Sequence, residues 1–166
     1  MNRRKILAAF LACFAFLAAV AGADDERLSL PEIKGWTSGE LRETTLDTVS
    51  GNQGCWQERN YRTESGVNVR AILTSGAGPR FHGNISQSVD SSDGPFGSGS
   101  RYRTLSIEVG DGLPLLAALE THPLLGRSIA IKTPLGTLTM ESDSFSADDE
   151  DFVSIATRLA LEVMPH

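Results

Sequence analysis

The chain has 166 residues, 40% of them hydrophobic, with 15 basic and 21 acidic side chains and a formal net charge of −6. This length is typical of one domain whose core is large enough to fold without metals or disulfides. A chain this acidic repels phosphate backbones, which excludes nucleic acid as a partner.

Residues 1–23 have the pattern of a secretory signal peptide. A short basic segment, Met1–Lys5, precedes an uncharged apolar run, Ile6–Val20, and small residues close the segment at Ala23. The run is shorter than the roughly 20 apolar residues of a membrane span. We therefore expect cleavage after Ala23, which leaves residues 24–166 as one periplasmic or secreted domain without stable membrane insertion; an uncleaved anchor is the alternative.

Cys55 is the one cysteine that remains after this cleavage, so no internal disulfide can form. It lies in a polar stretch, and we interpret it as a small, half-buried side chain. Pairing with a cysteine of another chain in an oxidising compartment is the alternative.

The first half of the domain is predicted to form strands and turns. The segment 30–36 contains a proline and a glycine and is predicted to be irregular, with apolar side chains that can pack into the core. A weak strand is predicted at 41–49, before a turn at 50–54. Alternation with a period of two then predicts a hairpin made of Cys55–Thr63 and Val67–Thr74, joined by Glu64–Gly66.

A Gly- and Ser-rich segment occupies the middle of the chain, from 75 to 100. It predicts one short strand at Phe81–Val89 and a flexible loop at Asp90–Ser100, where proteases should cut first. A phosphate-cradling loop is rejected, because the segment contains no lysine and leads into a strand rather than a helix.

Strands are predicted again after this segment. Tyr102–Val109 alternates with a period of two. Leu113–Leu119 is predicted as a strand rather than a short helix, because Pro114 and Pro123 leave little room for a helix. A second hairpin is predicted from Arg127–Thr133 and Thr137–Ser142, joined by Pro134–Gly136.

The C-terminal segment predicts an amphipathic helix over Asp148–Val163. Ser146 provides a hydroxyl cap with a carboxylate three residues on, and the acidic run Asp148–Asp151 lies at the positive end of the helix dipole. Pro165 ends the helix, and Arg158 is predicted on its solvent side. The apolar stripe consists of Phe152, Ile155, Ala156, Leu159, Ala160 and Val163.

No catalytic, cofactor-binding or metal-binding residue is predicted. The acidic run is contiguous, which fits compensation of the helix dipole rather than the alternating ligands of a calcium loop. The histidines His82, His122 and His166 are scattered, which disfavours zinc, and no Gly-x-Ser-x-Gly nucleophile elbow occurs. The sequence therefore predicts no cofactor and favours a non-catalytic protein.

Four arginines are the candidate binding residues. Arg62 and Arg70 are predicted on the polar side of the first hairpin, while Arg101 and Arg103 enter a later strand. If these strands are neighbours, the four guanidiniums share a surface suited to an anionic group or an acidic partner. The alternative is separate ion pairs with Glu58, Glu64 and Glu108.

Three features carry a resemblance to known proteins: Leu30-Pro31, Gly35-Trp36 and the terminal helix, Asp148–Val163. With the leader segment, this layout resembles small exported bacterial proteins of unknown function. It is also similar to the Mog1/PsbP-like group, whose members have a Pro…Gly-Trp start and cover a curved antiparallel sheet with helices. The resemblance implies a non-catalytic binding or accessory role and transfers no functional residue.

The predicted fold is α+β, an antiparallel sheet of about six or seven strands packed by the C-terminal amphipathic helix. The predicted function is that of an exported binding or accessory protein whose partner is a protein or a small ligand. Two alternatives stay open. A hydrolase-type enzyme would have a cleft with a coupled carboxylate or histidine pair, and a structural subunit of an envelope assembly would have a large apolar patch or an open strand edge.

Overall fold

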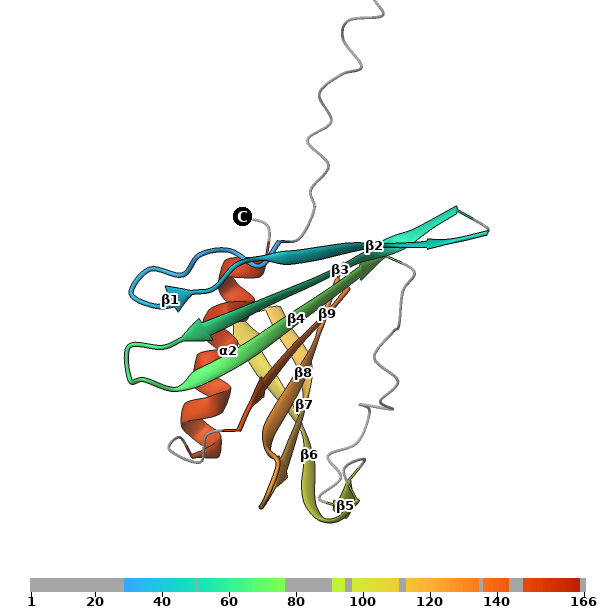
Figure 1. The fold of residues 1–166 in the computed structure, drawn as a ribbon. Coiled ribbons are helices and arrows are strands. Elements are labelled where there is room, and N and C mark those ends of the chain that lie inside the picture. The colour runs from blue at the N-terminus through green and yellow to red at the C-terminus, as the bar shows by residue number, and fades with distance from the viewer. Residues whose placement is uncertain are drawn as a thin grey trace, which may run out of the picture.

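The computed structural model describes residues 29–49, 51–76, 91–94, 97–110, 113–134, 136–143 and 148–164. Within these ranges the chain forms one antiparallel sheet of nine strands with one helix packed on it (Figure 1), so the α+β class is confirmed and the strand count exceeds the prediction. The predicted signal peptide, residues 1–23, and the predicted strand Phe81–Val89 lie outside the described residues. The elements are β1 (Thr37–Ser38), β2 (Arg42–Thr48), β3 (Gly51–Arg62), β4 (Asn68–Gly76), β5 (Ser91–Gly94), β6 (Gly97–Val109), β7 (Leu113–His122), β8 (Gly126–Thr133), β9 (Gly136–Ser142) and α2 (Asp149–Val163).

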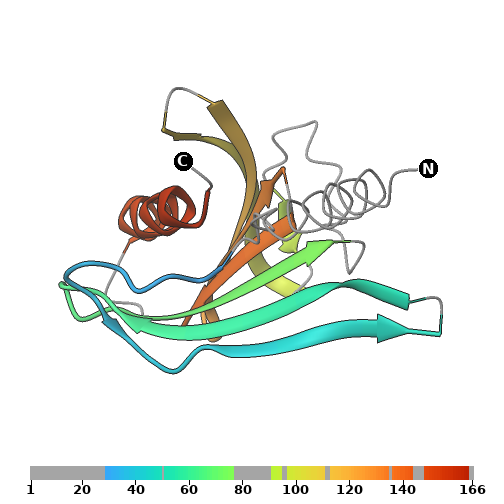
Figure 2. The same cartoon turned by 90° about the horizontal axis from the view of Figure 1, so that it is seen from above.

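Two blocks of strands make up the sheet. In the first, β3 pairs with β4 on one side and with β1 and β2 on the other; in the second, β5 to β9 form a continuous meander. The pairing of β4 with β9 joins the blocks and gives the order β1-β3-β4-β9-β8-β7-β6-β5. The sheet curls around α2 (Figure 2), so its inner face holds the core and its outer face points away from the helix.

Alternation with a period of two creates the inner face. In β4, the buried residues Val69, Ala71 and Leu73 alternate with more exposed neighbours. Paired residues of antiparallel strands share a face of the sheet, so the register extends this alternation from strand to strand. One resulting row of buried residues, each exposed by 1% or less, is Ala71, Met140, Ile129 and Leu119.

Helix α2 begins at the N-cap residue Asp148, whose carboxylate accepts a hydrogen bond from the Asp151 amide at 2.8 Å. The cap is therefore Asp148 and not the predicted Ser146, which lies outside the described residues. The predicted stripe faces the sheet, although Ile155 is only half-buried. Its buried members are Phe152, Ala156, Leu159, Ala160 and Val163.

The segment before β1 packs between the sheet and the helix. Leu30 and Ile33 are buried, and Trp36 contacts Tyr61 edge-to-face with ring centroids 5.8 Å apart. Arg158 is not simply on the solvent side of α2 as predicted, because its guanidinium lies over the Trp36 ring, 5.3 Å from the centroid. An arginine can cover an aromatic ring and still reach water, and the helical spacing of apolar residues does not reveal such a contact.

Two segments predicted as irregular are strands in the structure. Ser91–Gly94 forms β5 and pairs with the beginning of β6, so the loop predicted at Asp90–Ser100 is wrong over its described part. β3 likewise begins at Gly51, inside the predicted turn at 50–54. Backbone pairing does not need alternating side chains, so Gly- and Ser-rich segments can extend an existing ladder. The other predicted strands that fall within the described residues are present, as are both hairpins, and Leu113–Leu119 lies within β7.

Candidate binding site on the outer sheet face

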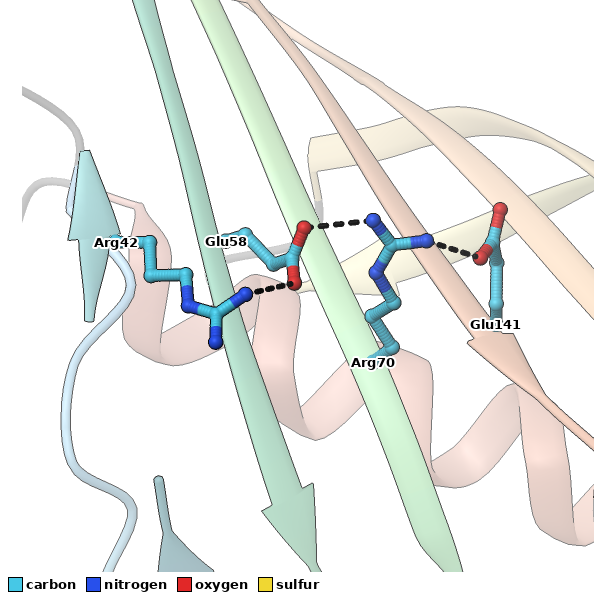
Figure 3. Close-up of polar contacts among 4 residues, drawn as sticks. All are labelled: Arg42, Glu58, Arg70 and Glu141. Atoms are coloured by element: carbon cyan, nitrogen blue, oxygen red, sulfur yellow. Dashed lines mark hydrogen bonds and ion pairs between the residues drawn. The ribbon is translucent and has the colours of Figure 1, made fainter. Parts of the chain in front are cut away.

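Four charged side chains form a row across neighbouring strands on the outer face (Figure 3). Arg42 of β2 and Arg70 of β4 flank Glu58 of β3, at N–O distances of 3.9 Å and 2.6 Å respectively. Arg70 also contacts Glu141 of β9 at 3.4 Å. The register brings these groups together, because Arg42 is paired with Glu58 and Arg70 with Glu141. Opposite charges thus alternate along the row, which is the favourable cross-strand arrangement.

Glu58 carries the central charge of this row, and its side chain is only 10% exposed. The hydrogen bond from Arg70 lowers the pKa of Glu58 below its ordinary value of 4.5; burial opposes this effect, and the charges of Arg70 and Arg42 add to it. The same hydrogen bond raises the pKa of Arg70. Both groups are therefore charged at neutral pH, and Glu58 fixes the position of the Arg70 guanidinium.

A groove of about 600 Å³ adjoins the Arg70–Glu141 pair on the outer face. Its volume lies in the range of small-molecule and cofactor sites, and its lining combines apolar surface with side chains of both charges. Arg70 and Glu141 are 46% and 41% exposed, so both side chains are accessible to a ligand. The residues with polar side chains that line the groove are Asn60, Tyr61, Asn68, Arg70, Arg127, Ser128, Glu141, Ser142 and Asp143.

The turn between β7 and β8 forms one rim of this groove. Leu125 lines the groove and is 59% exposed, and the adjacent Leu124 is 82% exposed. The ring of His122 fixes the turn, because its Nδ1 accepts hydrogen bonds from the amides of Leu124 and Leu125, both at 3.1 Å. Exposed leucines beside charged and amide side chains give the groove both apolar and hydrogen-bonding contacts for a partner.

A second polar hollow, of about 430 Å³, lies on the inner side at the beginning of α2. Asp149 accepts hydrogen bonds from Arg127 at 2.9 Å and from Thr121 at 3.2 Å, and Arg103 lies 3.9 Å away. Burial alone would raise the pKa of Asp149, but the hydrogen bonds from Arg127 and Thr121 hold it below its ordinary value of 3.8. We interpret this cluster as a clamp that attaches the helix to the sheet.

The four arginines predicted as one surface lie on opposite faces of the sheet. Arg62 and Arg70 are on the outer face, whereas Arg103 belongs to the inner-face row that contains Leu119. Arg101 lies two residues before Arg103 on the same face of β6, and β9, β8 and β7 separate β6 from β4. The strands are not neighbours, so the condition for a shared surface is not met. The alternative, an ion pair with Glu58, is confirmed for Arg70.

Several residues of the groove lie outside the predicted set. Glu141 lies 71 positions from Arg70 in the chain, and only the pairing of β4 with β9 brings them together. Asn60 and Asn68 belong to the predicted first hairpin, where alternation places polar residues on the outer face without indicating a groove. The polar side of that hairpin was therefore the one feature of the sequence that could have indicated these groove residues. The sequence does not reveal that β4 pairs with β9.

Metal ligands do not cluster in the part of the chain that the structure describes. Within those ranges, no group of three or more His, Cys, Asp or Glu side chains is placed to hold a metal ion. No helix among the same residues is long and apolar enough to cross a membrane. Cys55 is half-buried, as predicted, and its Sγ lies 3.8 Å from the Trp56 carbonyl oxygen.

Comparison with known proteins gives no family assignment. No protein-family description, curated protein or solved structure matches the chain. The resemblance to the Mog1/PsbP-like group is therefore neither supported nor refuted by a relative, and any function has to follow from the residues themselves.

Proposed function

We propose that the chain is an exported, non-catalytic binding protein, periplasmic or secreted, that holds a polar segment of a partner protein in the groove on its outer face. The observation that carries this proposal is the link between the charge row and the groove. Glu58 fixes Arg70, and Arg70 and Glu141 present opposite charges along one wall of the groove. A partner segment that bears both charges complements this wall, and the exposed Leu125 adds an apolar contact at its rim.

The titratable groups favour binding over catalysis. A general acid or base needs a pKa near the working pH. Glu58 and Asp149 instead have lowered pKa values, and arginines hold both carboxylates. The Nδ1 atom of His122 already accepts hydrogen bonds from two backbone amides. These three groups have structural partners, which supports a role in shaping the surface rather than in proton transfer.

A pair of tryptophan substitutions on β8 tests the groove. Ser128 and Lys132 lie on the outer face of the same strand, but only Ser128 lines the groove. Cross-linking in the native envelope followed by capture of the tagged protein should recover the partner with the wild type and with Lys132→Trp. Ser128→Trp fills the groove and should reduce recovery about tenfold, the effect of a loss of about 1.4 kcal/mol. Equal recovery by all three proteins would contradict the proposal.

The proposal that the protein is exported is tested separately. Residues 1–23 have the basic, apolar and small-residue pattern of a cleavable signal, so the mature protein should begin at Asp24. N-terminal sequencing of protein recovered outside the cytoplasm measures this directly. An intact Met1 on membrane-bound protein would instead support the uncleaved anchor.

A further inference from the structure

The turn between β7 and β8 is held by a side chain rather than by its own backbone. It connects the paired residues His122 and Gly126. Pro123 has no amide hydrogen, and the amides of Leu124 and Leu125 both donate to the Nδ1 atom of His122 at 3.1 Å. In the part of the chain that the structure describes, neither amide donates to a backbone carbonyl. The His122 ring is therefore the acceptor that fixes the turn.

Only a neutral imidazole can make these two hydrogen bonds. The Nδ1 atom accepts them through its lone pair, so the hydrogen of the neutral ring lies on Nε2. A second proton has to bind Nδ1, where it occupies the lone pair and points an N–H at the amides of Leu124 and Leu125. Protonation of His122 and the two hydrogen bonds therefore exclude each other. Histidine is also the side chain whose charge ordinarily changes between about pH 5 and pH 8.

The charged groups near His122 do not fix its ring in the protonated state. They are Glu120 on the same face of β7, Asp143 across Gly126, and on the other face of the sheet Arg101, Arg127 and Asp149. Within the described ranges, the contacts of the His122 ring are those with the two turn amides. The ring is half-buried, so once it is protonated it can rotate towards water and leave the turn without its acceptor.

We propose that His122 is a pH switch for the rim of the groove; its effect on the partner rests on the proposed function. With a neutral ring the turn is closed, and Leu125 lines the groove while it is 59% exposed. Protonation of His122 releases the amides of Leu124 and Leu125, so the turn loses the conformation that places Leu125 at the rim. The partner segment then loses its apolar contact, and its affinity falls in acid. The paired strands β7 and β8 below the turn keep their register.

An asparagine at this position separates the hydrogen bonds from the proton. Its side-chain oxygen accepts hydrogen bonds from nearby backbone amides but does not titrate. In NMR spectra of the wild type, the Leu124 and Leu125 amide signals should shift between about pH 8 and pH 5, with the same midpoint as the His122 ring. In His122→Asn these signals should not shift over that range, and in His122→Ala they should stay near their acid positions throughout. Wild-type amide signals that do not follow the ring would overturn the proposal.

Recovery of the partner connects the turn to the groove. The cross-linking and capture that test the groove are repeated at about pH 7.5 and about pH 5.5. Recovery by the wild type should fall about fivefold in acid, the effect of losing roughly one hydrogen bond's worth of support for the rim. His122→Asn should recover equal amounts at both pH values, and His122→Ala the lower amount at both. Equal recovery by the wild type at both pH values would overturn the switch. Recovery at neither pH would contradict the proposed function instead, and the NMR titration would still decide whether the turn responds to pH.

Discussion

At the scale of single residues, Glu58 shows how a buried charge is made compatible with a sheet. Its folded pKa is lowered, so the ionised carboxylate stabilises the fold. This contribution is present above the ordinary pKa of 4.5 and is lost as the pH falls through the lower, folded pKa. Glu58→Gln should lower the unfolding free energy by about 1–3 kcal/mol at neutral pH, because Arg70 loses its closest partner.

Melting temperatures measured from neutral to acid pH check this prediction. The wild type should lose stability as the pH falls below the pKa that Glu58 has in the unfolded chain. Glu58→Gln should lose less stability over the same pH range. Glu141→Gln is the matched control, since Glu141 contacts the same arginine but is 41% exposed. If the wild type and Glu58→Gln lose stability in parallel in acid, the ionised Glu58 carboxylate does not stabilise the fold.

Tyr61 gives a second titration, at the alkaline end. Its phenol is 2% exposed and donates a hydrogen bond to the Pro31 carbonyl at 2.8 Å. Burial raises its pKa from 10.0 to about 12. The folded state holds this proton more tightly than the unfolded chain does, so the protonated phenol stabilises the fold. This contribution is complete below pH 10.0 and is lost as the pH rises toward about 12. A phenolate absorbance titration should show a late phase that Tyr61→Phe removes; ionisation complete near pH 10.0 would contradict this.

At the scale of elements, two consecutive helix residues differ in what they contribute. Leu159 is fully buried, so Leu159→Ala leaves a cavity and should lower the unfolding free energy by about 2–5 kcal/mol. Arg158 lies over Trp36 and donates to the Lys34 carbonyl at 2.6 Å. Arg158→Ala should therefore lower the unfolding free energy by about 1 kcal/mol, although its side chain is 43% exposed.

Urea unfolding compares these variants with Glu162→Ala, an exposed position of the same helix, which should change stability by less than about 0.5 kcal/mol. Arg158→Lys should fall between the wild type and Arg158→Ala, because lysine keeps the charge but loses the planar contact with the ring. If Arg158→Ala behaves like Glu162→Ala, the contact with Trp36 does not stabilise the fold.

The same scale shows which elements a sequence can predict. Alternation predicts β4 and the β8–β9 hairpin, and helical spacing predicts α2, because each pattern reports burial within one element. Glycine and serine do not produce an alternating hydrophobic pattern, so a strand made of them cannot be predicted from burial. The sequence therefore predicts a loop at Ser91–Gly94, which forms a strand, and a turn at Gly51, where β3 begins. At Gly54 a side chain would clash with the Ser75 carbonyl, so a glycine that suggests a turn is in fact required by a strand.

At the scale of the whole molecule, the candidate site depends on strand order, which local patterns do not contain. The charge row needs β9 beside β4, so Glu141 could not be paired with Arg70 from the sequence. Strand order also separates Arg101 and Arg103 from Arg70. Alternation can place a residue on the polar or the apolar side of its own strand, but the surface that these positions form is a property of the assembled sheet.

The entry segment and the terminal helix pack into the same core, so the domain should unfold as one cooperative unit. Leu30 is 1% exposed and lies in the same core cluster as Leu159 of the terminal helix. If one core holds both, Leu30→Ala should lower the unfolding free energy by about 2–5 kcal/mol and shift a single cooperative transition. Leu124→Ala, at an exposed turn, should leave that transition within about 0.5 kcal/mol. Differential scanning calorimetry measures both, and equal calorimetric and van't Hoff enthalpies would confirm one cooperative unit. A second transition, or a Leu30→Ala melt like that of Leu124→Ala, would show that the entry segment is not part of the core.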